Sequence, residues 1–361
     1  MYIQIKNFFR KKPVGVLRSI EQHSKLKRSL GVFSLLSIGI GAVIGSGIFV
    51  FTGIAAQIAG PAVMLSFAVA GFTCILVAFV YTEVASALPV SGGSYTYAYV
   101  ALGEPIAWLV GWAAIVQFGC VAIAVSIGWS AYLLGVLEQF DIIFPQYLSK
   151  GFFEGGLFNL PAVIIAMLMS LILGKGTAES SVINIILVVI KLAAIFIFLG
   201  VSAPHIDTNN WSNFFPFGVN GMIAAAGTVF LSYTGFDAIA NAAEEAKRPE
   251  RDIVIALIGA VLFSAILYIL VSAAATGIVH YTKLNVSNPL TYALKLNNIN
   301  IGGAVVAAGT ITGMTSVIIL QMFALTRVLM AMSRDGLLPK CFGKIHSKYA
   351  TPYTNTMIVG V

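Results

Sequence analysis

Charged residues are scarce in this chain. Of its 361 residues, 10% are Asp, Glu, Lys or Arg, whereas 58% are hydrophobic. A soluble domain carries about 25% charged residues, so this composition excludes a soluble protein. The segment between Arg28 and Glu83 has no charge at all, and a membrane-spanning helix needs only about 20 apolar residues. The sequence therefore predicts an all-α, multi-pass membrane protein.

Cysteine patterns and catalytic motifs are also lacking. The three cysteines, Cys74, Cys120 and Cys341, form no even, spaced set, which excludes a disulfide framework and a cysteine metal signature. No nucleophile–base pair or metal-ligand spacing is present, so we expect neither an enzyme nor a cofactor or metal site. The basic N-terminus lacks the short apolar core and the cleavage site of a signal peptide.

The apolar segments and the basic residues together predict a topology. We expect spans at 33–57, 61–87, 105–137, 158–174, 181–202, 220–245, 252–279 and 303–332, with a ninth beginning near Pro352. With the N-terminus in the cytoplasm, most of the 21 Lys and Arg residues lie inside, and the outside holds only Lys150, Lys283 and Lys295. The net charge of +7 then reflects this retention of basic residues next to membrane lipid and does not indicate nucleic-acid binding. We expect the plasma membrane, the inner membrane of a bacterium. The oligomeric state stays open.

Two of the apolar segments are interrupted. The segment Gly39–Phe49 reads GIGAVIGSGIF, and the segment Phe230–Asp237 reads FLSYTGFD. A broken helix at membrane depth is tolerated only where it is buried in protein or lines a cavity. Two breaks at corresponding positions of two halves indicate the binding site of a secondary transporter.

The positions of the two breaks predict an inverted repeat. They fall in spans one and six, and because the number of spans between their starts is odd, the second half enters the membrane from the opposite face. We expect a cytoplasmic N-terminus at 1–30, a first repeat at 31–202, an extracellular loop at 203–219 and a second repeat at 220–361. The second repeat would be incomplete, which predicts a five-plus-five fold that is truncated at its C-terminus and does not transport as a fragment.

The first break suits an anion. Gly41, Gly45 and Gly47 permit unwinding, and the outer half-helix would then begin with unpaired N–H groups at a positive dipole end. A carboxylate is the natural ligand of such an end. The same glycines also suit close packing between helices, and the spacing alone leaves both interpretations open.

The second break suits an ammonium group. Gly235 marks it, with Ser232, Tyr233 and Thr234 before it, and the last carbonyls of the inner half-helix attract a cation. N–H groups at one break and carbonyls at the other together describe the zwitterion of an α-amino acid. Phe230 is either a lipid-facing aromatic or a thin gate over the substrate.

Charged residues inside the spans are the remaining candidates. Lys191 lies near the middle of span five, where an ammonium is costly unless it is solvated or paired. It is either the group that carries a coupling proton or a structural cation. Asp237 follows the second break, where it joins a gate or forms structural hydrogen bonds. Arg327, near the cytoplasmic end of span eight, is interpreted as an interfacial anchor.

Five stretches make the chain resemble the amino acid–polyamine–organocation transporters, and within them the bacterial relatives of the cationic amino acid transporters. They are GIGAVIGSGIF at 39–49, ASALPVSGGSYTYAYVALGEPIAWLVGW at 85–112, GWSAYL at 128–133, SYTGFDAIANAAEEAKRPERDI at 232–253 and TRVLMAMSRDGLLP at 326–339. The resemblance runs from about Leu30 to the end. It implies alternating access around an amino acid held between spans one, three, six and eight.

The resemblance also implies roles for single residues. Ser46 and Gly47, next to Gly45, match the backbone amides that hold the substrate carboxylate. The positions that bind the substrate amine through carbonyls match three residues, with Phe230 beside them: Val43, Leu231 and Thr234. Lys191 matches a lysine that substitutes for a sodium ion in proton-coupled members. Gln117 departs from the pattern, because many relatives have an acidic residue there, and this departure weakens the case for a cationic substrate.

These observations predict a secondary active transporter that imports amino acids by proton symport. A sodium-coupled member or an exchanger of the same fold is the alternative within this class, although Lys191 occupies the usual cation position. A pore-like or receptor-like membrane protein is the alternative from another class. Such a protein has no use for two inverted breaks.

Overall fold

The computed structural model describes residues 10–13, 15, 26–45, 47–138, 142, 144–151, 155–286 and 288–360; within its helices, the side chains of 177–179 and 300–302 are not described. In this part of the chain the regular structure is helical, and the β-structure is a single bridge between Leu30 and Ala246. Six segments are long and apolar enough to cross a membrane, and Leu160–Lys175 is a shorter apolar helix. The prediction of an all-α membrane protein is confirmed.

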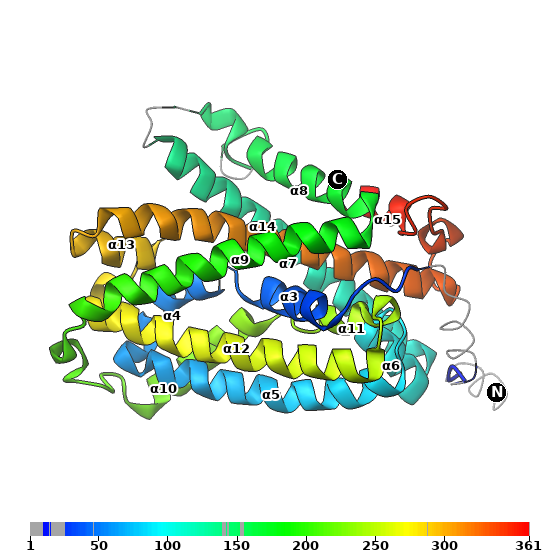
Figure 1. The fold of residues 1–361 in the computed structure, drawn as a ribbon, viewed down its shortest axis with the longest axis horizontal. Helices are drawn as coiled ribbons and strands as arrows, with labels where there is room; N and C mark the ends of the chain where they lie inside the picture. Colours follow the sequence, from blue (N-terminus) through cyan, green and yellow to red (C-terminus); the bar gives the residue numbers. More distant parts are fainter. Residues whose placement is uncertain are drawn as a thin grey trace.

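Helices follow one another along the described chain (Figure 1). Their bounds are α3 Val32–Val43, α4 Thr52–Ala59, α5 Val63–Ala87, α6 Gly93–Ala101, α7 Glu104–Glu138, α8 Leu160–Lys175, α9 Thr177–Ser202, α10 Gly218–Phe230, α11 Ala238–Asn241, α12 Pro249–Ile278, α13 Pro289–Leu296, α14 Asn300–Arg334 and α15 Tyr353–Val359. The expected spans coincide with these helices to within a few residues, including the start of α15 near Pro352.

Two short helices, α6 and α13, lie between expected spans. Each has fewer than ten residues, too few to give a spanning signal. The chain enters α6 through Gly92 and Gly93, which have φ angles of +105° and +47°. Because glycine adopts positive φ without a Cβ clash, the chain turns sharply here between α5 and α6.

The short helix α3 lies at the centre of the molecule. It packs against α9, α11, α12 and α14, and most of its residues from Leu35 to Val43 are buried. Figure 1 shows α3 between α9 on one side and α12 on the other, with α8 at the outer edge of the molecule. A glycine-rich helix suits this position, because the Cα atoms of glycine let neighbouring helices approach closely.

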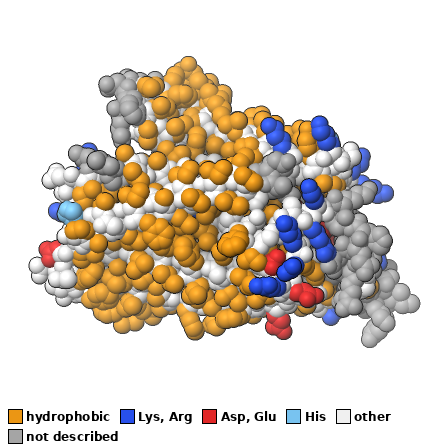
Figure 2. All heavy atoms as spheres, in the orientation of Figure 1, with side chains coloured by type: hydrophobic (Ala, Val, Ile, Leu, Met, Phe, Trp, Pro, Cys, Tyr) orange, Lys and Arg blue, Asp and Glu red, His pale blue; other side chains and the backbone are white. Residues whose placement is uncertain are grey.

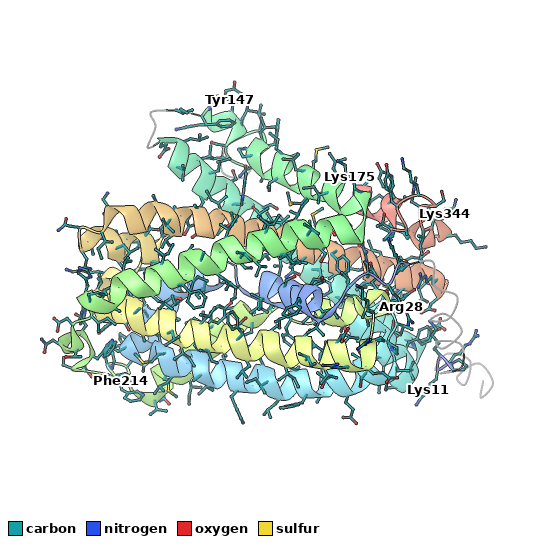
Figure 3. The ribbon with its side chains drawn as sticks, viewed as in Figure 1. Lys11, Arg28, Tyr147, Lys175, Phe214 and Lys344 are labelled. Carbon is teal, nitrogen blue, oxygen red and sulfur yellow. The ribbon has the colours of Figure 1, made fainter. Side chains whose placement is uncertain are left out.

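The surface has an apolar middle and a charged end. Large apolar side chains such as Phe72 and Ile123, both 63% exposed, cover the flanks (Figure 2). Lys and Arg side chains gather at the end that holds the N-terminus. In Figure 3, Lys11, Arg28 and Lys344 lie toward this end, and Phe214 lies toward the opposite one. This distribution fits a membrane-embedded protein with one basic face.

Candidate functional site

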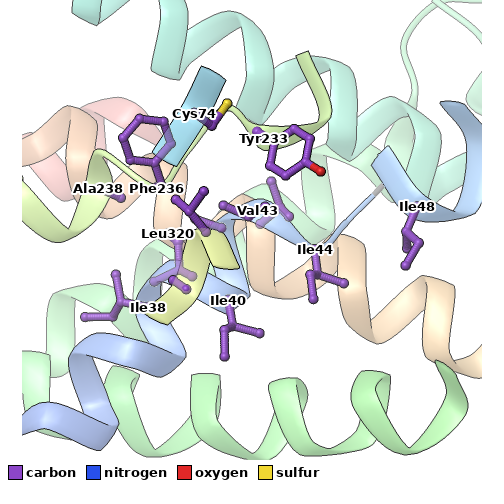
Figure 4. Packing of buried hydrophobic residues seen from close by; sticks show 14 of the residues in the cluster. Ile38, Ile40, Val43, Ile44, Ile48, Cys74, Tyr233, Phe236, Ala238 and Leu320 are labelled. Carbon is purple, nitrogen blue, oxygen red and sulfur yellow. The ribbon is translucent and has the colours of Figure 1, made fainter. Parts of the chain in front are cut away.

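The first break separates α3 from α4. Helix α3 ends at Val43, and Ile44 is extended, with φ −79° and ψ 97°. Helical structure resumes at Gly47 as a wide π-helical turn, Gly47–Phe51, that continues into α4. Figure 4 shows Ile44 and Ile48 on the two sides of this break. Ser46 lies outside the described residues.

The second break separates α10 from α11. A tight 3-10 turn, Leu231–Tyr233, follows α10, and Thr234 is then extended. Gly235 has a φ of +114°, a value that side chains other than glycine rarely permit. A Cβ atom at this position would lie 3.0 Å from the carbonyl oxygen of Ala42. The two breaks therefore lie against each other at the centre of the bundle.

Tyr268 of α12 links the two breaks. Its hydroxyl oxygen lies 2.8 Å from the carbonyl oxygen of Val43 and 2.8 Å from that of Ser232. The hydroxyl has one hydrogen, so it donates to one carbonyl at a time. Its ring packs against Phe67 and Tyr233. Tyr268 is a functional candidate that the sequence pattern does not single out; its one signal is a phenol hydroxyl in the middle of an apolar span.

One cavity of about 1150 Å³ is lined by both breaks. The expected site residues that line it are Val43, Gly45, Gly47, Gln117, Phe230, Leu231 and Thr234. The other walls come mainly from α7 and α14. Phe230 is 41% exposed, so its ring is not packed into the core. The structure thus brings together seven of the residues selected from the sequence.

Two backbone carbonyls at the breaks already accept a hydrogen bond from within the protein. The Val43 carbonyl accepts from Tyr268, and the Leu231 carbonyl accepts from the Thr234 N–H group at 3.2 Å. Each carbonyl oxygen has two lone pairs and can accept a second hydrogen bond. An ammonium group that enters the cavity would use this second position.

Lys191 approaches the first break from α9. Its side chain is completely buried, and its Nζ donates to the carbonyls of Ile40, Gly41 and Ile44 at 3.2, 2.9 and 2.6 Å. The Ser316 hydroxyl of α14 lies 2.8 Å from the same nitrogen. These carbonyls belong to the C-terminal end of α3, where the helix dipole is negative. Lys191 thus joins α9 to the end of α3 at the first break.

Asp237 lies beside the main cavity and does not line it. It lines a smaller cavity of about 190 Å³ together with Gln117, Phe230 and Thr234, which border both cavities. Gln117 of α7 and Asp237 of the second broken segment both line this smaller cavity. In the described part of the chain, Asp237 Oδ1 is buried without a hydrogen-bond partner. The two residues form one polar cluster between α7 and the second break.

Buried ion pairs close the bundle at the N-terminal end. Arg327 Nη2 lies 2.8 Å from Glu245 Oε1, and both side chains are fully buried. Arg334 Nη1 lies 3.0 Å from both carboxyl oxygens of Glu244. The interpretation of Arg327 as an interfacial anchor is wrong, because a buried acid from the end of the second broken segment binds it. The position of Arg327 near a span end suggests exposure to water. Glu245 is too distant in sequence for the pattern to indicate an ion pair.

A second layer of contacts lies around Asp335. Lys12 forms an ion pair with this carboxylate, and the Tyr95 hydroxyl donates to it at 2.9 Å. Burial, followed by the proximity of Asp335, raises the pKa of Tyr95 above its ordinary value, so the phenol stays neutral and keeps donating. The segment before α3 is therefore tied to α6 and to the end of α14.

Comparisons with known proteins agree with this geometry. Residues 30–361 match a family described as amino acid permease. The chain is 42% identical over 360 residues to a methylthioribose transporter of Bacillus subtilis (strain 168), covering 99% of this chain and 78% of the relative. It is 40% identical to a branched-chain amino acid permease of the same organism, covering 98% and 77%. It is 37% identical over 328 residues to the chloroplastic cationic amino acid transporter 9 of Arabidopsis thaliana, covering 89% and 58%.

Proposed function

Because the chain belongs to the amino acid permease family, we propose that it is a secondary active transporter that imports amino acids across the plasma membrane by proton symport and alternating access. One observation carries the proposal: two broken helices of opposite polarity end at one cavity. The break after α3 offers N–H groups, and the break after α10 offers carbonyls. A zwitterion needs both.

The roles of the site residues follow from this polarity. The backbone around Gly45, Ser46 and Gly47 receives the substrate carboxylate. The carbonyls of Val43, Leu231 and Thr234 receive the amine, through lone pairs that the protein leaves free. Phe230 covers the substrate, since its half-exposed ring borders the cavity. Gln117 and Asp237 act as a gate or structural pair beside it.

The names of the relatives leave two substrate classes for this chain, amino acids and the thiosugar methylthioribose. The paired ends at the breaks favour an amino acid. A thiosugar lacks the carboxylate for the N–H groups and the ammonium for the carbonyls. It would leave both helix ends without a charged partner.

The proposed architecture is a five-plus-five inverted repeat. Segment 31–202 forms the first repeat, 203–219 the external loop, and 220–361 the second repeat, with 1–30 in the cytoplasm. The gathering of Lys and Arg at the N-terminal end supports this orientation. Because α3 and α10 begin from opposite membrane faces in this arrangement, rocking one half against the other opens the cavity to each side in turn.

Lys191 is the proposed proton site. Oxygens of uncharged groups surround its Nζ, so no carboxylate in the described residues fixes its charge. Loss of the proton would weaken three contacts with the end of α3 and release α9 from the first break. The proton drives the cycle only if it binds one conformation better than the other. A permanently bound sodium ion would compete with the ammonium for the same oxygens.

The test is accumulation of a radiolabelled amino acid under an inward proton gradient, in liposomes that hold the protein as the cell makes it. We expect Lys191→Ala to abolish accumulation while substrate binding, measured by calorimetry, persists, because the backbone groups at the breaks remain. The matched control is Lys175→Ala, which removes an exposed lysine at the end of α8 and leaves accumulation unchanged. Accumulation by Lys191→Ala that still follows the proton gradient would refute the role of Lys191. Accumulation by the unmodified protein that follows a sodium gradient alone would refute proton symport.

A further inference from the structure

We infer that the substrate has an uncharged, largely apolar side chain, which lies between α7 and α14 while its polar head meets the two breaks. The inference rests on the proposed function, because it assigns a direction to the side chain of an amino acid in the proposed site. It names the substrate class that this cavity accepts.

The walls of the main cavity are apolar beyond the breaks. Helix α7 contributes Val116, Val121 and Ala124, and α14 contributes Met314 and Val317. Among the described residues, the lining of this cavity includes no Asp, Glu, Lys, Arg or His. Its polar side chains are uncharged. An amino acid held at the breaks therefore directs its side chain toward hydrocarbon.

The two charged residues beside the breaks, Lys191 and Asp237, do not line the main cavity. Lys191 does not line the cavity, because its ammonium is turned to the carbonyls of α3 and to Ser316. Asp237 lines the smaller cavity and is separated from the main one by Gln117, Phe230 and Thr234, which border both. When the cavity closes around a bound substrate, a lysine or glutamate side chain would thus lose water without gaining an opposite charge from the lining. An unpaired buried charge is unfavourable by several kcal/mol, so the cavity rejects it.

Pairs of amino acids of similar size test the inference directly. Glutamine and glutamate differ in charge and hardly in shape, and methionine and lysine have similar lengths. Binding to the purified 361-residue chain is measured by calorimetry and by thermal shift, since a ligand stabilises the state that it binds. We expect methionine and leucine to bind. Lysine should bind at least about 100-fold more weakly than methionine, and glutamate at least about 100-fold more weakly than glutamine.

A matched pair of variants tests the location of the side chain. Cys120 lies on the α7 wall of the cavity and is exposed, so a slightly larger side chain fits there. Cys120→Asp places a carboxylate in the wall, and Cys120→Asn has the same shape without the charge. We expect lysine to bind at least about 10-fold more tightly to Cys120→Asp than to Cys120→Asn, because the carboxylate supplies the missing partner.

The outcomes separate the inference from the proposed function. Lysine or glutamate binding as tightly as its uncharged counterpart would overturn the inference and leave amino acid transport standing. Equal lysine affinity of the two Cys120 variants would overturn the placement of the side chain against α7. Binding of methylthioribose without binding of any amino acid would overturn the proposed function. A folded protein that binds none of these ligands would overturn both.

Discussion

The ion pair between Arg327 and Glu245 allows the loss of stability in a variant to be predicted quantitatively. It joins α14 to the end of the second broken segment, and both side chains are 0% exposed. Arg327 Nη2 and Nε lie 2.8 and 2.9 Å from the same carboxyl oxygen, Glu245 Oε1. The guanidinium also stacks on Phe323, at 3.9 Å from the ring centroid. Glu245→Gln removes the negative charge and keeps the shape.

The expected cost follows from these distances. Two unit charges 2.8 Å apart attract each other by about 6 kcal/mol at an effective dielectric constant of about 20. Desolvation of the two ions offsets much of this attraction, so the net value of the pair is small. Removing one partner alone leaves the desolvation of the other uncompensated. We therefore expect Glu245→Gln to reduce the free energy of unfolding by about 3–5 kcal/mol.

The assay is unfolding in mixed micelles by titration with sodium dodecyl sulfate, followed by circular dichroism. The control is Glu250→Gln, which neutralises an exposed acid in the first turn of α12 and should change the free energy of unfolding by less than about 0.5 kcal/mol. In the double variant with Arg327→Met, the buried positive charge is also gone and the contact with Phe323 is retained. Most of the lost stability should then return.

Two results would refute this reasoning. If Glu245→Gln unfolds like the control, Arg327 has another source of compensation and the pair does not hold α14 to the broken segment. If the double variant is as unstable as Glu245→Gln alone, the loss comes from packing or from other partners of Glu245, and an uncompensated charge is not its cause.

Two further predictions concern the breaks, and both use the same unfolding assay. A Cβ atom at Gly45 would collide with Val317 Cγ2, so Gly45→Ala should reduce the free energy of unfolding by about 1–3 kcal/mol through overpacking. Adding Val317→Ala should recover most of this loss. No recovery would show that the backbone conformation, and not the contact with Val317, requires glycine at this position. Tyr268→Phe removes the donor shared by the carbonyls of Val43 and Ser232 and should cost about 1–3 kcal/mol, because a buried acceptor is left unsatisfied; unchanged stability would mean that water replaces the hydroxyl.

The spans and both breaks could be predicted because their signals are local. A charge-free apolar run reveals a membrane helix wherever it packs, and Gly235 needs no distant partner to mark a break. Lys191 was found for the same reason, since a lysine in the middle of a span is unusual regardless of its neighbours. Each of these features can be recognised from local sequence because the hydrocarbon of the membrane disfavours charges and unpaired backbone groups wherever they lie.

The partners of these residues could not be predicted in the same way. Ser316 and Tyr268 are hydroxyl side chains among others in their spans, and only the packing of α12 and α14 around α3 turns them toward the breaks. The helices α6 and α13 were missed because they are too short to cross a membrane. The Arg327–Glu245 pair joins residues that are far apart in sequence, and the position of Arg327 near a span end suggested a different environment.

The contrast between the two buried cations indicates where the molecule can move. Arg327 has a carboxylate partner, and loss of that partner is costly. Among the described residues, the groups that contact Lys191 Nζ are uncharged, and three of them are carbonyls at one helix end. A small rotation of α3 would remove several of these contacts at once, and on the proposed function this is how the charge of Lys191 follows the conformation. The ion pair resists opening of the bundle at the N-terminal end, whereas the role proposed for Lys191 is to couple a proton to the position of the first break, so the Glu245 and Lys191 variants should affect stability and coupling separately.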